Sequence, residues 1–180
     1  MDLWGEANRA FFASRAWTTV RDGSGRRILK YPTDLYAYEE LIRHTKPEVI
    51  VETGSFEGGS ASWFARFAEV ISVDVKRPVD GGPPGVTWIE GDSVLMAHEV
   101  ATLVADRSCL VTLDSDHNAS HVLAELEVYA PLATQYLVVE DTAVDVYGIE
   151  LEHYPGGGPG TAVSTWLKAH AGWEPDPFYD

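Results

Sequence analysis

Acidic residues follow two apolar runs in the C-terminal half of the chain. One run is followed by Asp114-Ser-Asp-His117 and the other by Glu140-Asp141. If the two runs form neighbouring parallel strands, about 5 Å apart, their terminal carboxylates can meet around one cation. Asp114, Glu140 and Asp141 would supply the hard oxygen ligands that Mg²⁺ prefers. Asp116 is better explained as a cap for the helix that follows.

His117 is the candidate catalytic base. It falls three residues after Asp114, near the start of the next predicted helix. From there its imidazole could reach a substrate hydroxyl held at the metal and remove the proton. His121 follows four residues later, but Val122 and Leu126 mark the buried face of the same helix. We therefore assign His121 to the flank of that helix.

A glycine-rich turn marks a second candidate site. The segment Glu52-Thr-Gly-Ser-Phe-Glu-Gly-Gly-Ser60 joins an apolar run to a helical pattern. In an open α/β sheet, ligands bind at such strand-to-helix junctions, where glycines admit close approach and the free N–H groups of the helix attract anionic groups. The spacing departs from the dinucleotide fingerprint G-x-G-x-x-G, which counts against NAD. It resembles the first motif of class I S-adenosylmethionine (SAM) methyltransferases.

Two further acidic residues extend this constellation. Asp74 ends the next apolar run about twenty residues beyond the turn, where an acid accepts hydrogen bonds from ribose hydroxyls. The alternative is a strand-end residue that caps a turn. Asp92-Ser93 follows the third run, where methyltransferases of this class contact adenine. Asp92 could equally be the N-cap of the helix from Val94, and the two roles are compatible.

The elements that must position these residues alternate along the chain. Near-continuous apolar runs separated by amphipathic patterns predict a mainly parallel sheet with helices on both faces, in an α/β, Rossmann-like arrangement. We expect one domain over residues 1–180, with an N-terminal helix and a flexible turn in residues 1–27 and a helix capped by Tyr31-Pro-Thr-Asp34 that runs to about His44. The runs lie at 48–53, 70–75, 86–90, 109–114 and 136–141, and the later helical patterns at 59–68, 93–105, 117–130 and 160–171.

Composition excludes several classes of protein. The 13 basic and 28 acidic residues give a net charge of −15, which argues against a nucleic-acid partner. No segment approaches the ~18 apolar residues of a membrane span, and the N-terminus lacks the features of a signal peptide. Cys109 is the only cysteine, so an internal disulfide is excluded. These features favour a cytoplasmic protein with no membrane partner.

Taken in order, the motifs resemble the cephalosporin hydroxylase family. The resemblance is carried by Lys30-Tyr-Pro-Thr-Asp34, the glycine turn, Asp114-Ser-Asp-His117, Val139-Glu-Asp-Thr142 and Gly158-Pro-Gly160. That family is similar to class I methyltransferases, and its relatives include Mg-dependent macrolide and rhamnosyl O-methyltransferases. The resemblance implies Asp114, Glu140 and Asp141 as Mg²⁺ ligands and His117 as the base. It implies a SAM site at the glycine turn and the next two strand ends: Glu52, Gly54, Ser55, Gly58, Ser60, Asp74, Asp92 and Ser93.

We therefore expect a Mg²⁺-dependent SAM O-methyltransferase that acts on a hydroxyl of a small natural product, a sugar or polyketide, in antibiotic biosynthesis. Two alternatives remain: a SAM- and metal-binding accessory protein to an oxygenase, and non-methyl chemistry in the same pocket.

One departure from the class concerns the end of the sheet. Proteins of this class finish the sheet with an antiparallel hairpin, whereas the segment from Trp173 has room for one proline-interrupted strand. Either the hairpin is reduced, another subunit covers the edge, or the chain is shortened. This edge, together with the apolar Trp4, Phe11 and Phe12, predicts a homo-oligomer.

Overall fold

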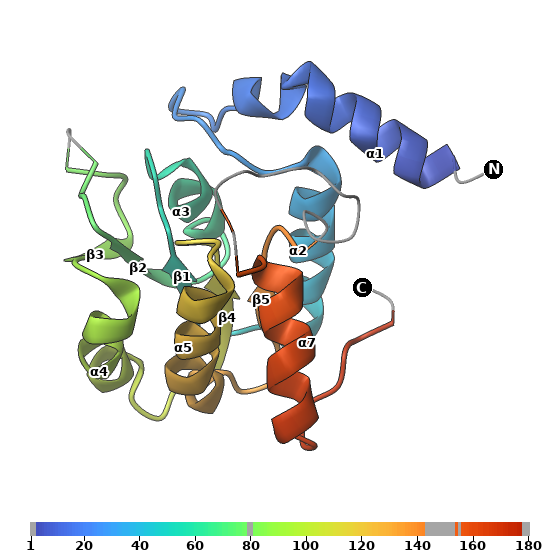
Figure 1. Cartoon of the computed structure of the whole chain (residues 1–180). Helices are drawn as coiled ribbons and strands as arrows, with labels where there is room; N and C mark the ends of the chain where they lie inside the picture. The colour runs from blue at the N-terminus through green and yellow to red at the C-terminus, as the bar shows by residue number, and fades with distance from the viewer. Residues whose placement is uncertain (1–2, 79–80, 143–153, 155, 178–180) are drawn as a thin grey trace.

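A five-stranded parallel sheet forms the centre of the molecule (Figure 1). The computed structural model describes residues 3–78, 81–142, 154 and 156–177, without the side chains of residues 3–5, 8 and 9. The strand order is β3-β2-β1-β4-β5, and every pair is parallel. The strands are β1 (Val49–Thr53), β2 (Glu69–Asp74), β3 (Val86–Glu90), β4 (Cys109–Leu113) and β5 (Leu137–Val139).

Helices cover both faces of this sheet, which confirms the predicted α/β arrangement. One face packs against α4, α5 and α7, and the other against α2 and α3. The α-helices are α1 (Leu3–Ser14), α2 (Pro32–Thr45), α3 (Gly59–Phe64), α4 (Ser93–Val104), α5 (Ala119–Tyr129) and α7 (Pro159–Ala169), and the 3₁₀ turns are η1 (Ala16–Thr19) and η2 (Ala130–Leu132).

The alternation of side chains along β1 explains the two cores. Val49 and Val51 belong to the cluster under α4, α5 and α7, whereas Ile50 belongs to the cluster under α2 and α3. Successive residues of a strand point to opposite faces, so a continuous apolar run serves both cores.

Strand register brings the polar strand ends to one level. Thr53 of β1 pairs with Val73 of β2 and with Leu113 of β4, and Leu113 pairs with Val139 of β5. The next residue on each of these four strands is therefore Gly54, Asp74, Asp114 or Glu140. Four residues from distant parts of the chain consequently lie along one edge of the sheet.

Some boundaries differ from the prediction. Helix α2 has Tyr31 at its N-cap and Pro32 in its first turn, so Asp34 lies within the first turn and does not cap the helix. Proline favours this place because its missing N–H would have had no helical partner. Strand β5 ends at Val139, and both Glu140 and Asp141 lie beyond it.

The two ends of the described chain lie away from the sheet centre. Helix α1 stands apart from the sheet layers (Figure 1), and the described part of the segment from Trp173, residues 173–177, contains no strand. Near α1, Phe11 packs against Tyr31 with 5.1 Å between ring centroids, and Phe12 stacks on Trp17 at 5.8 Å. Within the described residues, no helix has the length and apolar character needed to span a membrane.

Candidate active site

Two adjoining cavities open at the carboxyl edge of the sheet. The larger, of about 1060 Å³, is lined by residues that include Gly54, Asp74, Asp114, His117 and Asp141. The smaller, of about 290 Å³, shares Gly54 and Asp74 with it and extends to the start of α4. These volumes are those of small-molecule sites, and the edge is where α/β sheets bind ligands.

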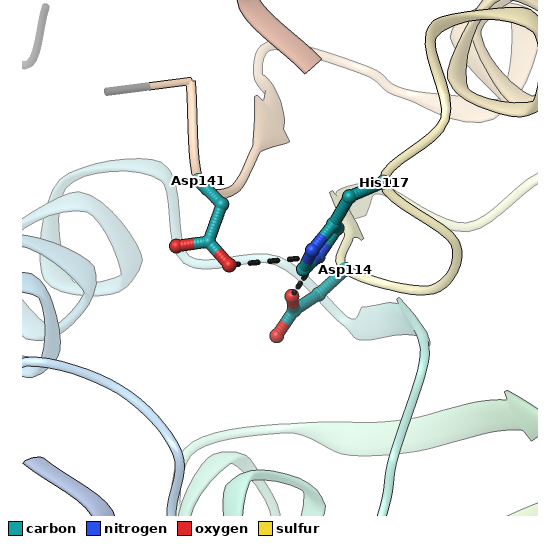
Figure 2. Close-up of side chains that lie close together, drawn as sticks. All are labelled: Asp114, His117 and Asp141. Atoms are coloured by element: carbon teal, nitrogen blue, oxygen red, sulfur yellow. Dashed lines mark hydrogen bonds and ion pairs between the residues drawn. The ribbon is translucent and has the colours of Figure 1, made fainter. Parts of the chain in front are cut away.

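His117 lies between two carboxylates (Figure 2). Its Nε2 is 3.2 Å from Asp114 Oδ1 and 3.5 Å from Asp141 Oδ2. One ligand atom from each of these three residues falls within 4.8 Å of the others, a spacing that could hold a metal ion. The hydrogen bond with Asp114 raises the pKa of His117, and burial raises the pKa of Asp141 to about 6.

Glu140 reaches the same cluster but is held by other groups. Its Oε1 accepts a hydrogen bond from Lys30 Nζ at 2.8 Å and another from the Tyr38 hydroxyl. The Tyr38 hydroxyl also contacts Thr112 Oγ1 at 2.6 Å. Of the three predicted metal ligands, Asp114 and Asp141 therefore belong with His117 to the group that could share one ion, whereas Glu140 lies outside that group and has one oxygen committed to Lys30 and Tyr38.

Lys30 is a site residue that the sequence reasoning missed. Only 3% of its surface is exposed, and its Nζ lies 2.8 Å from both Asp114 Oδ2 and Glu140 Oε1. Burial alone would lower the pKa of Lys30, but Asp114 and Glu140 outweigh this effect and the pKa is raised. The sequence feature that could have indicated Lys30 is its position directly before Tyr31-Pro-Thr-Asp34, a motif that resembles the family but was assigned no chemical role.

The glycine turn lies directly against the backbone of Asp114. Gly54 has φ +81°, and a Cβ at this position would stand 1.9 Å from the backbone oxygen of Asp114. Only glycine fits such an approach. Asp74 Oδ2 accepts hydrogen bonds from the N–H groups of Ser55 at 2.8 Å and Phe56 at 2.9 Å. Asp74 therefore holds the turn and also lines both cavities.

Glu52 lies one layer below the cavity wall. It is fully buried, and its Oε2 accepts a hydrogen bond from Ser72 Oγ at 2.9 Å. Burial raises the pKa of Glu52 to about 7, against the lowering effects of Lys30 and of the Ser60 and Ser72 hydroxyls. Ser55 is buried and contacts the Ser72 hydroxyl. Glu52 thus supports the turn from beneath.

The other turn residues fall on both sides of this wall. Ser55 and Ser60 line the larger cavity. Gly58 is the N-cap of α3, with φ +77°, and is packed beside Trp88 and Pro78. Some of the residues predicted to bind SAM therefore line the larger cavity, whereas Glu52 and Gly58 lie behind the residues that line it.

Asp92 and Ser93 line the smaller cavity, where the adenine contacts were predicted. Asp92 Oδ1 accepts a hydrogen bond from Leu95 N–H at 3.0 Å, which confirms its N-cap role. His121 also lines this cavity, and its Nε2 lies 3.0 Å from Ser93 Oγ. The prediction that His121 lies only on the flank of its helix did not identify it as a cavity-lining residue, because helical periodicity does not show what lies opposite the helix.

The segment between β4 and α5 is held by a buried acid, Glu125, and by a local turn at Asp116. Ser115 Oγ donates a hydrogen bond at 2.7 Å to Glu125, which is fully buried. Asp116 Oδ1 accepts the N–H of Asn118 at 2.9 Å, immediately before α5 begins. The N-cap of α5 is Asn118, so the prediction that Asp116 caps this helix is wrong: its side chain closes a turn onto the N-cap residue and reaches no N–H group of the first helical turn.

Comparison with known proteins identifies the relatives of this chain. The sequence model of the family described as rhamnosyl O-methyltransferase/CmcI matches residues 15–180. A rhamnosyl O-methyltransferase of Mycobacterium leprae (strain TN) is 30% identical over 183 residues, which cover 93% of this chain and 79% of the relative. One from Mycobacterium tuberculosis (strain ATCC 25618 / H37Rv) is 30% identical over 172 residues, covering 86% and 68%.

Solved structures share the fold at lower identity. The apo structure of CmcI aligns with a TM-score of 0.66 and 18% identity, over 94% of this chain and 77% of CmcI. MycE, a methyltransferase from the mycinamycin biosynthetic pathway solved with Mg and SAH, aligns with a TM-score of 0.56 and 18% identity. That alignment covers 79% of this chain and 41% of MycE, so the present chain spans less than half of MycE. The family match and the curated relatives show that this chain belongs to the rhamnosyl O-methyltransferase/CmcI family.

Proposed function

We propose that this protein is a Mg²⁺-dependent SAM O-methyltransferase that acts on a hydroxyl of a small natural product, such as a sugar, in secondary metabolism. The observation that carries the proposal is the placement of His117 between Asp114 and Asp141, on the wall of the cavity that also contains the glycine turn. Family membership and the names of the curated relatives favour a sugar hydroxyl as the acceptor.

The glycine turn and the smaller cavity fit SAM. The close approach at Gly54 and the acidic Asp74 beside it suit a ribose, and Asp92 with Ser93 suits the adenine ring. When bound, SAM supplies an electrophilic methyl group on a sulfonium. The turn residues would hold this cofactor near the Asp114–His117 segment, because the backbone of Gly54 lies against that of Asp114.

The carboxylate cluster fits a hard divalent cation. Asp114 and Asp141 each direct an oxygen toward the space beside His117, and Glu140 lies next to Asp114 with one oxygen held by Lys30. A Mg²⁺ ion in this place would lower the pKa of an acceptor hydroxyl and orient it. Oxygen ligands from two strand ends are the donor set that such an ion prefers.

His117 performs the proton transfer in this scheme. Its ring, held between Asp114 and Asp141, would take the proton of the acceptor hydroxyl, whose oxygen would then be able to accept the methyl group that bound SAM would supply. Alignment of the acceptor with the cofactor supplies much of the acceleration. Asp114 and Asp141 stabilise the positive charge that develops on the imidazole, since both lie within 3.5 Å of Nε2.

Methyl transfer is tested directly with the purified protein, SAM, MgCl₂ and rhamnose-bearing glycosides. We expect products heavier than the acceptor by one CH₂ unit, detected by mass spectrometry. EDTA should abolish turnover while calorimetry still detects SAM binding, because the turn holds SAM independently of the metal. Full transfer in EDTA would contradict the metal dependence. Binding of SAM without any methylated product would favour the accessory-protein alternative, and a product of another mass would favour non-methyl chemistry.

A further inference from the structure

Lys30 is a cation buried in the middle of an acidic cluster. Among the residues whose side chains the structure describes, it is the only buried lysine or arginine. Its Nζ forms ion pairs of 2.8 Å with Asp114 and Glu140, which lie 84 and 110 residues further along the chain. A buried ammonium is unfavourable unless it is paired, so this placement is supported by its two partners.

The two partners come from neighbouring strand ends and would repel each other without Lys30. Asp114 follows β4 and Glu140 follows β5, and the residues before them pair in the sheet. Asp141 adds a third carboxylate to the same cluster. Like charges in a site shielded from water destabilise it, and one ammonium shared by two carboxylates offsets that repulsion.

Lys30 bonds to one oxygen of each partner carboxylate. Lys30 takes Oδ2 of Asp114, whereas Oδ1 of the same carboxylate lies 3.2 Å from His117 Nε2. The hydroxyl of Tyr38 shares Glu140 Oε1 with Lys30. Lys30 therefore holds Oδ2 of Asp114 and, together with Tyr38, Oε1 of Glu140, while Oδ1 of Asp114 faces His117.

We propose that Lys30 is the positioning residue of the carboxylate cluster, a built-in cation that holds Asp114 and Glu140 in place before a divalent cation binds beside it. Folding of the cluster then does not depend on metal. The metal-dependent part of this inference rests on the proposed function, whereas the coupling between Lys30 and Glu140 does not.

Thermal unfolding of Lys30→Met in EDTA and in MgCl₂, at constant ionic strength, tests the proposal. In EDTA the variant should unfold on the order of 10 °C below the wild type, because two carboxylates lose their buried partner. Mg²⁺ should raise its unfolding temperature more than that of the wild type, since the ion replaces the missing charge. Lys168→Met, a change of an exposed lysine on α7, is the control and should match the wild type in both conditions.

A double variant separates positioning from general loss of packing. Lys30→Met/Glu140→Gln removes one uncompensated carboxylate, so it should unfold at a higher temperature than Lys30→Met in EDTA. Additive effects of the two changes, or a Lys30→Met protein as stable as the wild type in EDTA, would overturn the proposal. A measurable rise in unfolding temperature on addition of Mg²⁺ that is equal in the wild type and in Lys30→Met would overturn the proposal as well.

Two further outcomes are also decisive. If Lys30→Met alone does not fold, a folded double variant supports the proposal and an unfolded one overturns it. If Mg²⁺ shifts neither protein, the double variant in EDTA still decides the role of Lys30, and the metal dependence in the proposed function is what fails.

Discussion

At the scale of single residues, the site separates groups that face the cavity from groups that support them. His117 and Asp141 face the larger cavity, whereas Glu52 is buried beneath the turn. Burial raises the pKa of both carboxyl groups, to about 6 for Asp141 and to about 7 for Glu52, so the two acids differ in their access to the cavity and not in the direction of the pKa shift. Substitutions at the two levels should consequently change different measurements.

Replacement of His117 by alanine should slow methyl transfer. Loss of a general base typically lowers the rate by ~10²–10⁴-fold, and kcat should fall within that range. Binding of SAM, measured by calorimetry, should be unchanged, because the glycine turn is held by Asp74, whereas the hydrogen-bond and ion-pair partners of His117 are Asp114 and Asp141. A variant that keeps the wild-type kcat would exclude His117 as the base.

Glu52 should make stability depend on pH. Its pKa is about 7 in the folded protein and near 4.5 when unfolded, because burial disfavours the charged form. The folded state thus binds the proton more tightly, and the stability from Glu52 is full below about pH 4.5 and is lost as pH rises through about 7. The whole effect corresponds to about 3 kcal/mol.

Unfolding by urea at pH 5 and pH 8, with Glu52→Gln for comparison, measures this effect. The wild type should lose stability relative to the variant between the two values, since glutamine does not titrate. Parallel behaviour of the two proteins across this range would show that Glu52 has an ordinary pKa.

At the scale of elements, strand register creates the site. Pairing of β1 with β4 places Gly54 against the backbone of Asp114, and pairing of β4 with β5 places Glu140 beside Asp114. The turn after β1 is therefore in contact with the ends of its neighbours. A change at this turn should disturb both the proposed SAM site and the carboxylates beside it.

Gly54→Ala is expected to destabilise the protein by about 3 kcal/mol or more, because its Cβ would overlap the Asp114 backbone and its φ is unfavourable for alanine. Gly23→Ala is the matched control, since no atom lies within 4 Å of a Cβ at that position. Chemical denaturation of both variants measures the difference. Equal stability of the two would mean that the turn can move away from β4 at little cost.

At the scale of the whole molecule, the β5 edge remains partly uncovered by the described chain. The three residues of β5 are apolar, yet each is only half-buried, and they line a cavity of about 500 Å³ with Trp166 and Trp173. Apolar surface of this kind commonly marks an interface. The expectation of a homo-oligomer therefore stays a prediction with a definite place on the surface.

Light scattering at micromolar concentration should give a mass that is a multiple of the 19.8 kDa protomer. Leu137→Glu, on β5, should lower that mass, because a charge is costly in a buried interface. Leu103→Glu, at an exposed position on α4, should leave it unchanged. A monomeric mass for the wild type would refute the prediction.

The sequence by itself determined the sheet, its helices and the residues at the strand ends. Apolar runs such as 109–114 and the acids that follow them are contiguous in the chain, so local periodicity identifies them. Only the tertiary structure decided how these residues are used. Lys30 meets Asp114 and Glu140 across 84 and 110 residues, and Asp74 turns back to bind the N–H groups of the glycine turn. Such contacts depend on strand order and register, which a local pattern does not contain, because they arise only when the whole sheet is assembled.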